Sequence, residues 1–187
     1  MYQAAPPEKA APDPYAPVAV ELGHANWAAL LAWLCPGAGH LYQRRYAKSV
    51  LFMVCILGTY FFGLSLAGGH TVYASFHKED YRLQYICQLG VGLPALPAVV
   101  QATLVRMGHK PLWNGVMAPP RTGGKSELAE WHKRWPQSFE MGTLFTVVAG
   151  LLNVLAIYDA HSGPVYATEE SSKKPKQPPE PETEKGA

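Results

Sequence analysis

Long apolar runs separated by polar segments predict helices along most of this chain. Four such runs lie at about residues 17–42, 46–67, 85–105 and 141–158. They are continuous runs of helical length, whereas the strands of a membrane barrel alternate apolar and polar residues over about ten positions. A helix needs about 20 residues to cross the hydrocarbon layer at about 1.5 Å per residue. We therefore predict an all-α polytopic membrane protein with about four transmembrane helices.

Two of the four segments contain helix-breaking residues. In 17–42, the sequence Pro36-Gly37-Ala38-Gly39 follows the dense apolar part. We expect this segment to span fully from Pro17; the alternative is a re-entrant helix, which would change the side on which the N-terminus lies. In 85–105, kinks are expected at the helix-breaking residues, which membrane helices tolerate when neighbours satisfy the freed backbone groups. These residues are Gly90, Gly92, Pro94 and Pro97.

The two ends of the chain are polar and rich in proline. Residues 1–16 are Ala/Pro-rich, and 161–187 form a tail of mixed charge. Such sequences bury too little apolar surface to offset the entropy of ordering. We predict that both ends are disordered and that residues 17–160 form the membrane domain.

Basic residues predict which side of the membrane each connection faces. The turn after the first segment contains Arg44, Arg45 and Lys48 with no acid, and the connection 106–140 contains six Lys and Arg residues. The loop 68–84 contains only two, Lys78 and Arg82. Positive residues collect on the cytoplasmic side. The Arg44-Arg45 turn and the connection 106–140 are therefore expected in the cytoplasm, and the loop 68–84 outside. Within 106–140, residues 126–136 are expected to form an amphipathic helix on the cytoplasmic surface, because their apolar residues share one side.

Composition adds little to this prediction. The net charge of +2 gives no sign of a nucleic-acid partner, and the three cysteines lie singly in apolar stretches without a C-x-x-C pair. The seven histidines show no metal-ligand spacing. We therefore expect no disulfide framework, no metal, no cofactor and no nucleic acid.

Small residues in two segments predict close contacts between helices. Gly142, Thr146 and Gly150 are four positions apart and so share one helix face, beside Asn153. Small residues let membrane helices approach closely, and an asparagine can hydrogen-bond across the interface. The candidates for helix packing are Gly37, Gly39, Gly142, Thr146, Gly150 and Asn153.

Aromatic and basic residues near the ends of the apolar segments are candidates for contact with lipid headgroups. Amphipathic rings favour the membrane–water interface, and Lys and Arg reach lipid phosphates. These candidates are His40, Tyr42, Arg44, Arg45, Lys48, Trp131 and Trp135. Asp159-Ala160-His161-Ser162 brings an acid, an imidazole and a hydroxyl together, but a catalytic triad requires groups placed by separate elements. We interpret Asp159 as an interfacial or capping group.

Two resemblances to known families follow from these motifs. The pattern P-G-x-G-H-x-Y-x-x-R-x-x-K, from Pro36 to Lys48, resembles the two-transmembrane-helix domain family, in which a glycine-rich helix and an aromatic-basic turn precede a second helix; Gln43 stands where that family often has glycine. Residues 117–120 together with 139–160 are similar to an uncharacterised bacterial family of small multi-pass membrane proteins. This resemblance implies a membrane location and four helices, and it implies no activity. The expected location is the bacterial cytoplasmic (inner) membrane.

The expected function is that of a non-enzymatic membrane component. Its expected partners are the lipid bilayer and either another membrane protein or further copies of itself. The helix-packing candidates would make these contacts. The alternative is a small transporter or channel subunit, because broken helices such as 85–105 often mark binding sites in transporters.

Overall fold

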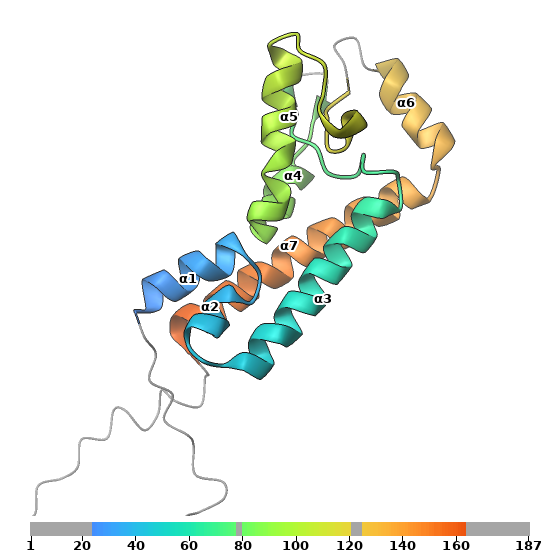
Figure 1. Cartoon of the computed structure of the whole chain (residues 1–187). Helices are drawn as coiled ribbons and strands as arrows, with labels where there is room; N and C mark the ends of the chain where they lie inside the picture. Colours follow the sequence, from blue (N-terminus) through green and yellow to red (C-terminus); the bar gives the residue numbers. More distant parts are fainter. Residues whose placement is uncertain (1–23, 78–79, 121–124, 164–187) are drawn as a thin grey trace, which may run out of the picture. The chain divides into compact units, whose positions relative to one another are not determined.

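The computed structural model describes residues 24–77, 80–120 and 125–163, and this part of the chain is mainly helical (Figure 1). The predicted disordered end 1–16 and all but the first residues of the predicted tail 161–187 lie outside the described residues. The α-helices are α1 (Ala25–Leu34), α2 (Ala38–Tyr42), α3 (Tyr46–Ser65), α4 (Gln84–Gln88), α5 (Pro97–Arg106), α6 (Lys125–Arg134) and α7 (Ser138–Ser162). Three short 3₁₀ helices are η1 (Leu89–Val91), η2 (Leu93–Ala95) and η3 (Trp113–Gly115). Two-residue strands β1 (Phe76–His77) and β2 (Asp80–Tyr81) pair antiparallel, with Phe76 opposite Tyr81.

Two helices of the described part, α3 and α7, are long and apolar enough to cross a membrane. They correspond to the predicted segments 46–67 and 141–158. The two helices pack side by side and antiparallel (Figure 1). Gly63 near the end of α3 meets Gly142 near the start of α7, and Arg45 just before α3 lies 3.1 Å from Asp159 near the end of α7. The sequence predicted four such helices, and the described residues contain two.

The first predicted segment, 17–42, is broken in its described part. Helix α1 ends at Leu34, and Gly37 adopts a left-handed conformation with φ of 86°. A β-carbon at Gly37 would overlap the carbonyl oxygen of Ser49, so the turn requires glycine. The ten residues of α1 rise only about 15 Å, about half of a hydrocarbon layer.

The third predicted segment, 85–105, is broken in the same way. It contains α4, η1, η2 and α5, with a reversal at Gly92, whose φ is 84°. A β-carbon there would overlap the carbonyl oxygen of Trp33, so no larger residue fits. Pro94 and Pro97 lack an N–H, which prevents a continuous helix through this region.

The two broken segments approach α7 from opposite ends. Arg82 contacts Thr143 and Gly90 contacts Gly150, so the chain from Arg82 to Gly90 runs along α7 towards its middle before it reverses at Gly92. From the other end, Ala28 and Ala32 of α1 pack with Ala160 of α7, and the carbonyl of Ala32 reaches Asn153. The third segment contacts α7 between Thr143 and Gly150, and the first contacts it between Asn153 and Ala160. Each segment therefore follows only part of the length of α7. Both segments turn near Asn153.

This arrangement corrects the predicted sidedness of the connections. The loop 68–84 and the connection 106–140 are in contact: Met117 N donates to Gly69 O at 2.8 Å, and the His70 ring stacks on Trp131. The prediction that they face opposite sides is wrong, because 85–105 turns back instead of crossing. The Arg44-Arg45 turn lies at the other end of the α3–α7 pair. The sequence predicted that this turn and the connection 106–140 both face the cytoplasm. If α3 and α7 both cross a membrane, the two lie on opposite sides of it.

Candidate functional site

Helix α7 has its polar and small residues inside and its large apolar residues outside. Thr146, Gly150 and Asn153 are buried, whereas Leu144, Leu151 and other large apolar residues on the same helix are exposed. Leu151 keeps 50% of its surface exposed, and Asn153, two positions later, is fully buried. A water-soluble core helix has the reverse pattern.

Glycines allow the backbones to come together along the inner face of α7. A β-carbon at Gly142 would lie 2.5 Å from the carbonyl oxygen of Gly63 on α3. A β-carbon at Gly150 would overlap the carbonyl oxygen of Cys87 on α4, and one at Gly90 would lie 2.7 Å from the carbonyl oxygen of Gly150. Gly39 is similarly close to the Ala28 carbonyl of α1. These packing candidates lie at contacts of α2, α3 and α4 with neighbouring helices.

Asn153 joins the two broken segments to α7. Its Nδ2 donates to Ala32 O at 3.1 Å and to Gly90 O at 2.9 Å. Both acceptors are backbone carbonyls next to a break in a helix, where the regular helical partner is missing. Asn153 therefore satisfies two backbone groups in a buried position, one from each broken segment.

Further polar contacts hold the third segment against the first half of α7. Buried Gln88 donates from Nε2 to Thr146 Oγ1 at 2.8 Å and to Thr71 O at 3.1 Å. Arg82 donates to Thr71 O at 2.8 Å and to Thr143 Oγ1 at 3.0 Å, and its guanidinium lies 4.2 Å from the centre of the Tyr73 ring. The sequence did not predict these roles of Arg82, Gln88 and Thr71. The available signals were Gln88, a polar residue within the apolar run 85–105, and Arg82, a basic residue shortly before it.

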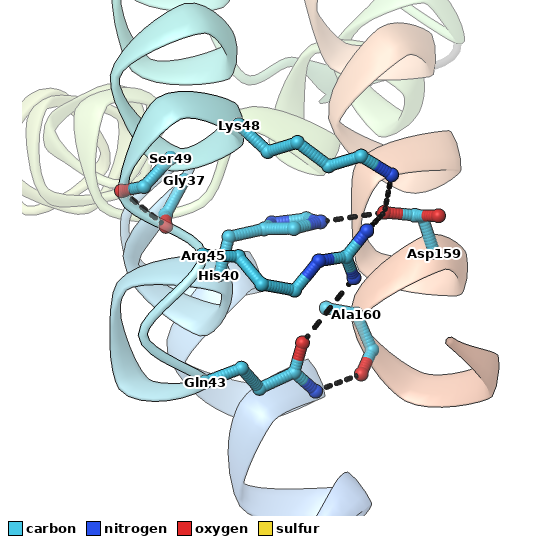
Figure 2. Close-up of polar contacts among 8 residues, drawn as sticks. All are labelled: Gly37, His40, Gln43, Arg45, Lys48, Ser49, Asp159 and Ala160. Carbon is cyan, nitrogen blue, oxygen red and sulfur yellow. Dashed lines mark hydrogen bonds and ion pairs between the residues drawn. The ribbon is translucent and has the colours of Figure 1, made fainter. Parts of the chain in front are cut away.

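A second polar cluster holds the end of α7 to the turn before α3 (Figure 2). Asp159 Oδ2 accepts from His40 Nε2 at 2.8 Å, from Arg45 Nη2 at 3.1 Å and from Lys48 Nζ at 3.4 Å. Next to it, Gln43 Nε2 donates to Ala160 O at 2.6 Å. The sequence treated these groups separately, because 119 positions separate His40 from Asp159.

The His40–Asp159 pair acts as a structural link in this arrangement. The side chain of His40 is fully buried, whereas the sequence placed its ring at the water interface. Burial lowers the pKa of the His40 imidazole below its usual value, with Arg45 and Lys48 acting in the same direction and Asp159 opposing them. A neutral ring then donates one hydrogen bond to the Asp159 carboxylate. The ring is closed off by this burial, and its Nδ1 has no hydrogen-bond partner within the described part of the chain.

The remaining headgroup candidates have different environments. Tyr42 and Arg44 are exposed, and Arg44 has a φ of 60°. Trp131 is 9% exposed and stacks on His70, so it is part of the packing and not of a lipid-facing belt. Trp135 is half-buried, with the Arg134 guanidinium 4.8 Å from its ring centre. Across residues 24–77, 80–120 and 125–163, no cluster of three or more His, Cys, Asp or Glu side chains is arranged to hold a metal ion.

These features define a helical protein with two apolar helices of membrane-crossing length, one of which, α7, turns a polar and small-residue face towards the two broken segments. The chain belongs to a family of unknown function (DUF6677), whose model matches residues 27–174. No curated protein and no solved structure matches the chain. The match agrees with the resemblance to an uncharacterised family. The resemblance of the first hairpin to the two-transmembrane-helix domain family, and the bacterial origin, stay predictions.

Proposed function

We propose that this chain is an integral membrane protein in which α3 and α7 cross the bilayer. In this proposal α1–α2 and α4–α5 enter the membrane from opposite sides and turn back near Asn153. The observation that supports it best is the inside-out arrangement of the two long helices. Only 22% of the most apolar window of α3 and 39% of that of α7 is buried within the fold. A soluble protein rarely leaves so much contiguous apolar surface exposed to water.

The proposed topology places His24, the Arg44-Arg45 turn and Gly163 on one side, and residues 66–83 and 107–137 on the other. Basic residues occur at both ends: Arg44 and Lys48 at one, Lys110 and Lys133 at the other. The rule that basic residues collect in the cytoplasm therefore does not select one end. The proposed location is the cytoplasmic membrane of a bacterium; the resemblance of residues 117–120 and 139–160 to a bacterial family of membrane proteins supports it.

The proposed role is that of a non-enzymatic component that binds a membrane partner or further copies of itself. The Nδ2 of Asn153 and the carboxylate of Asp159 make contacts between segments, which supports a structural role for these two groups. The surface left for a partner within the bilayer is the exposed apolar side of α3 and α7, which includes Val54 and Leu155.

A matched pair of lysine substitutions tests the membrane location. Leu151 and Leu112 are similarly exposed, at 50% and 47%, but Leu151 lies in the middle of α7 and Leu112 in the connection 107–137. Lysine at the centre of a spanning helix costs about 2.5–3.5 kcal/mol of insertion free energy. We expect Leu151→Lys to reduce the fraction of the protein that stays in the membrane during alkaline carbonate extraction. We expect Leu112→Lys to leave this fraction unchanged.

Two results of this experiment would contradict the proposal. One is wild-type protein that alkaline carbonate removes from membranes. The other is wild-type-like behaviour of both lysine variants, as expected if both positions are ordinary surface positions in water.

A second candidate function is that of a small transporter or channel subunit. It is favoured by the two broken segments that meet at Gly92 and Trp33, since interrupted helices at mid-membrane form binding sites in transporters. The close packing at Gly92 and Gly150 leaves no room for a solute in this conformation. Solute flux in proteoliposomes that Asn153→Leu abolishes would favour this candidate over the first.

A further inference from the structure

A half-open cavity of about 620 Å³ lies at the end of the molecule formed by the connections after α3 and before α7. Its walls come from four places in the chain. His70 follows α3, Val105 is near the end of α5, residues 108–119 form a loop, and Glu127 and Trp131 belong to α6. None of the contacts described above for Asn153 or Asp159 involves this cavity.

The walls of the cavity are held in place by several contacts. The Trp131 and His70 rings stack with centres 4.5 Å apart and planes inclined by 19°. Fully buried Gln101 donates to Leu112 O at 2.7 Å and to Val116 O at 2.9 Å, and accepts from Leu112 N at 2.9 Å. These bonds hold a strained loop, because three residues other than glycine have positive φ: Trp113, Asn114 and Met117. Strain of this kind persists where the surroundings impose it, often at ligand sites. The cavity is therefore pre-formed.

The lining offers several N–H donors and one full positive charge. Lys110 supplies the ammonium, Asn114 an amide, and His70 and His109 imidazoles. Burial lowers the pKa of His70, so this ring is neutral at physiological pH. Glu127 supplies a carboxylate on the α6 wall. Clustered N–H donors around a lysine suit the oxygens of a phosphate group.

The cavity also lies close to the ends of the two long helices. His70 comes five positions after the last residue of α3, and Trp131 seven positions before the first residue of α7. If both helices cross the bilayer, these residues lie at the level of the lipid headgroups. A lysine at that level is within reach of lipid phosphates.

We propose that this cavity binds the phosphate group of an organic ligand, with Lys110 as the charged contact. A glycerophosphate lipid headgroup and a soluble phosphate ester share this chemistry. The lipid source rests on the proposed membrane function, whereas the soluble source does not.

Two probes and three variants of the full chain test this proposal. One probe is glycerol 3-phosphate, whose binding is measured by calorimetric titration. The other is phosphatidylglycerol, whose retention by the protein in nanodiscs is compared with the retention of phosphatidylcholine. Lys110→Gln should raise the dissociation constant of at least one probe about tenfold, because a hydrogen bond to a charged group contributes enough binding free energy for a tenfold change. Lys133→Gln, on an exposed position of α6 outside the lining, should change binding less than about twofold. Glu127→Gln should strengthen binding, because it removes a negative charge from the wall.

The outcomes separate the two sources. Binding of glycerol 3-phosphate supports a soluble ligand, and selective retention of phosphatidylglycerol alone supports a headgroup. Binding of glycerol 3-phosphate by protein that carbonate removes from membranes would support the cavity proposal and contradict the membrane proposal. The cavity proposal is overturned if neither probe binds, if Lys133→Gln weakens binding as much as Lys110→Gln, or if Glu127→Gln weakens it.

Discussion

Gly150→Ala is expected to destabilise the protein by about 1–3 kcal/mol, the usual cost of overpacking. For a chain of this length, that corresponds to a melting temperature lower by roughly 2–12 °C. The reason is local: the new β-carbon would overlap the carbonyl oxygen of Cys87, and backbone atoms cannot move away as a flexible side chain could. Thermal unfolding in detergent measures the effect, and Gly150→Leu should cost more.

Gly58 provides a matched control on the other long helix. A β-carbon at Gly58 meets no atom within 4 Å, so Gly58→Ala creates no overlap. Alanine is the better helix former by about 1 kcal/mol, so this variant should be unchanged or more stable. Equal melting temperatures for Gly150→Ala and Gly58→Ala would show that α4 does not pack against Gly150.

The second large effect is expected at Asn153. Asn153→Leu preserves the size of the side chain but removes the donor to Ala32 O and Gly90 O. An unsatisfied buried polar group costs about 1–3 kcal/mol, and two carbonyls lose their partner here. We expect a loss of thermal stability of at least about 2 kcal/mol, measured by thermal unfolding in detergent.

The same substitution at Asn26 is the control. Asn26 is exposed on α1, and Asn26→Leu changes the same atoms without removing a contact between segments. If the two variants unfold at the same temperature, Asn153 does not join the two segments. A gain in stability for Asn153→Leu would indicate that its side chain faces lipid.

The two long helices were predictable because their signal is local. Both 46–67 and 141–158 are apolar runs of sufficient length, and no residue within them ends the helix. The spacing of Gly142, Thr146 and Gly150 also marked one face of α7 before the structure showed these residues buried. Periodicity identifies the face that packs, because it depends only on the geometry of one helix.

The path of the two broken segments was not predictable in the same way. The residues that break them, such as Gly37 and Gly92, were recognised as sources of kinks. Whether a kinked segment continues across the bilayer or reverses depends on what it meets, and the contact of Gly92 with the Trp33 carbonyl joins positions 59 apart in the chain. The His40–Asp159 pair was not predictable for the same reason, because its two residues are 119 positions apart in the chain. The charge rule then misassigned the loops, because it assumed that 85–105 crosses.

The most direct test of the account determines which end of the α3–α7 pair is exposed on each side of the membrane. Arg44 and Lys133 are exposed and lie at opposite ends of this pair. Each is replaced by cysteine in a background where Cys35, Cys55 and Cys87 are alanine, and an impermeant maleimide is added to intact cells and to inverted vesicles. We predict that Arg44→Cys and Lys133→Cys label from opposite sides, whichever side each one takes. Labelling of both from the same side would contradict it.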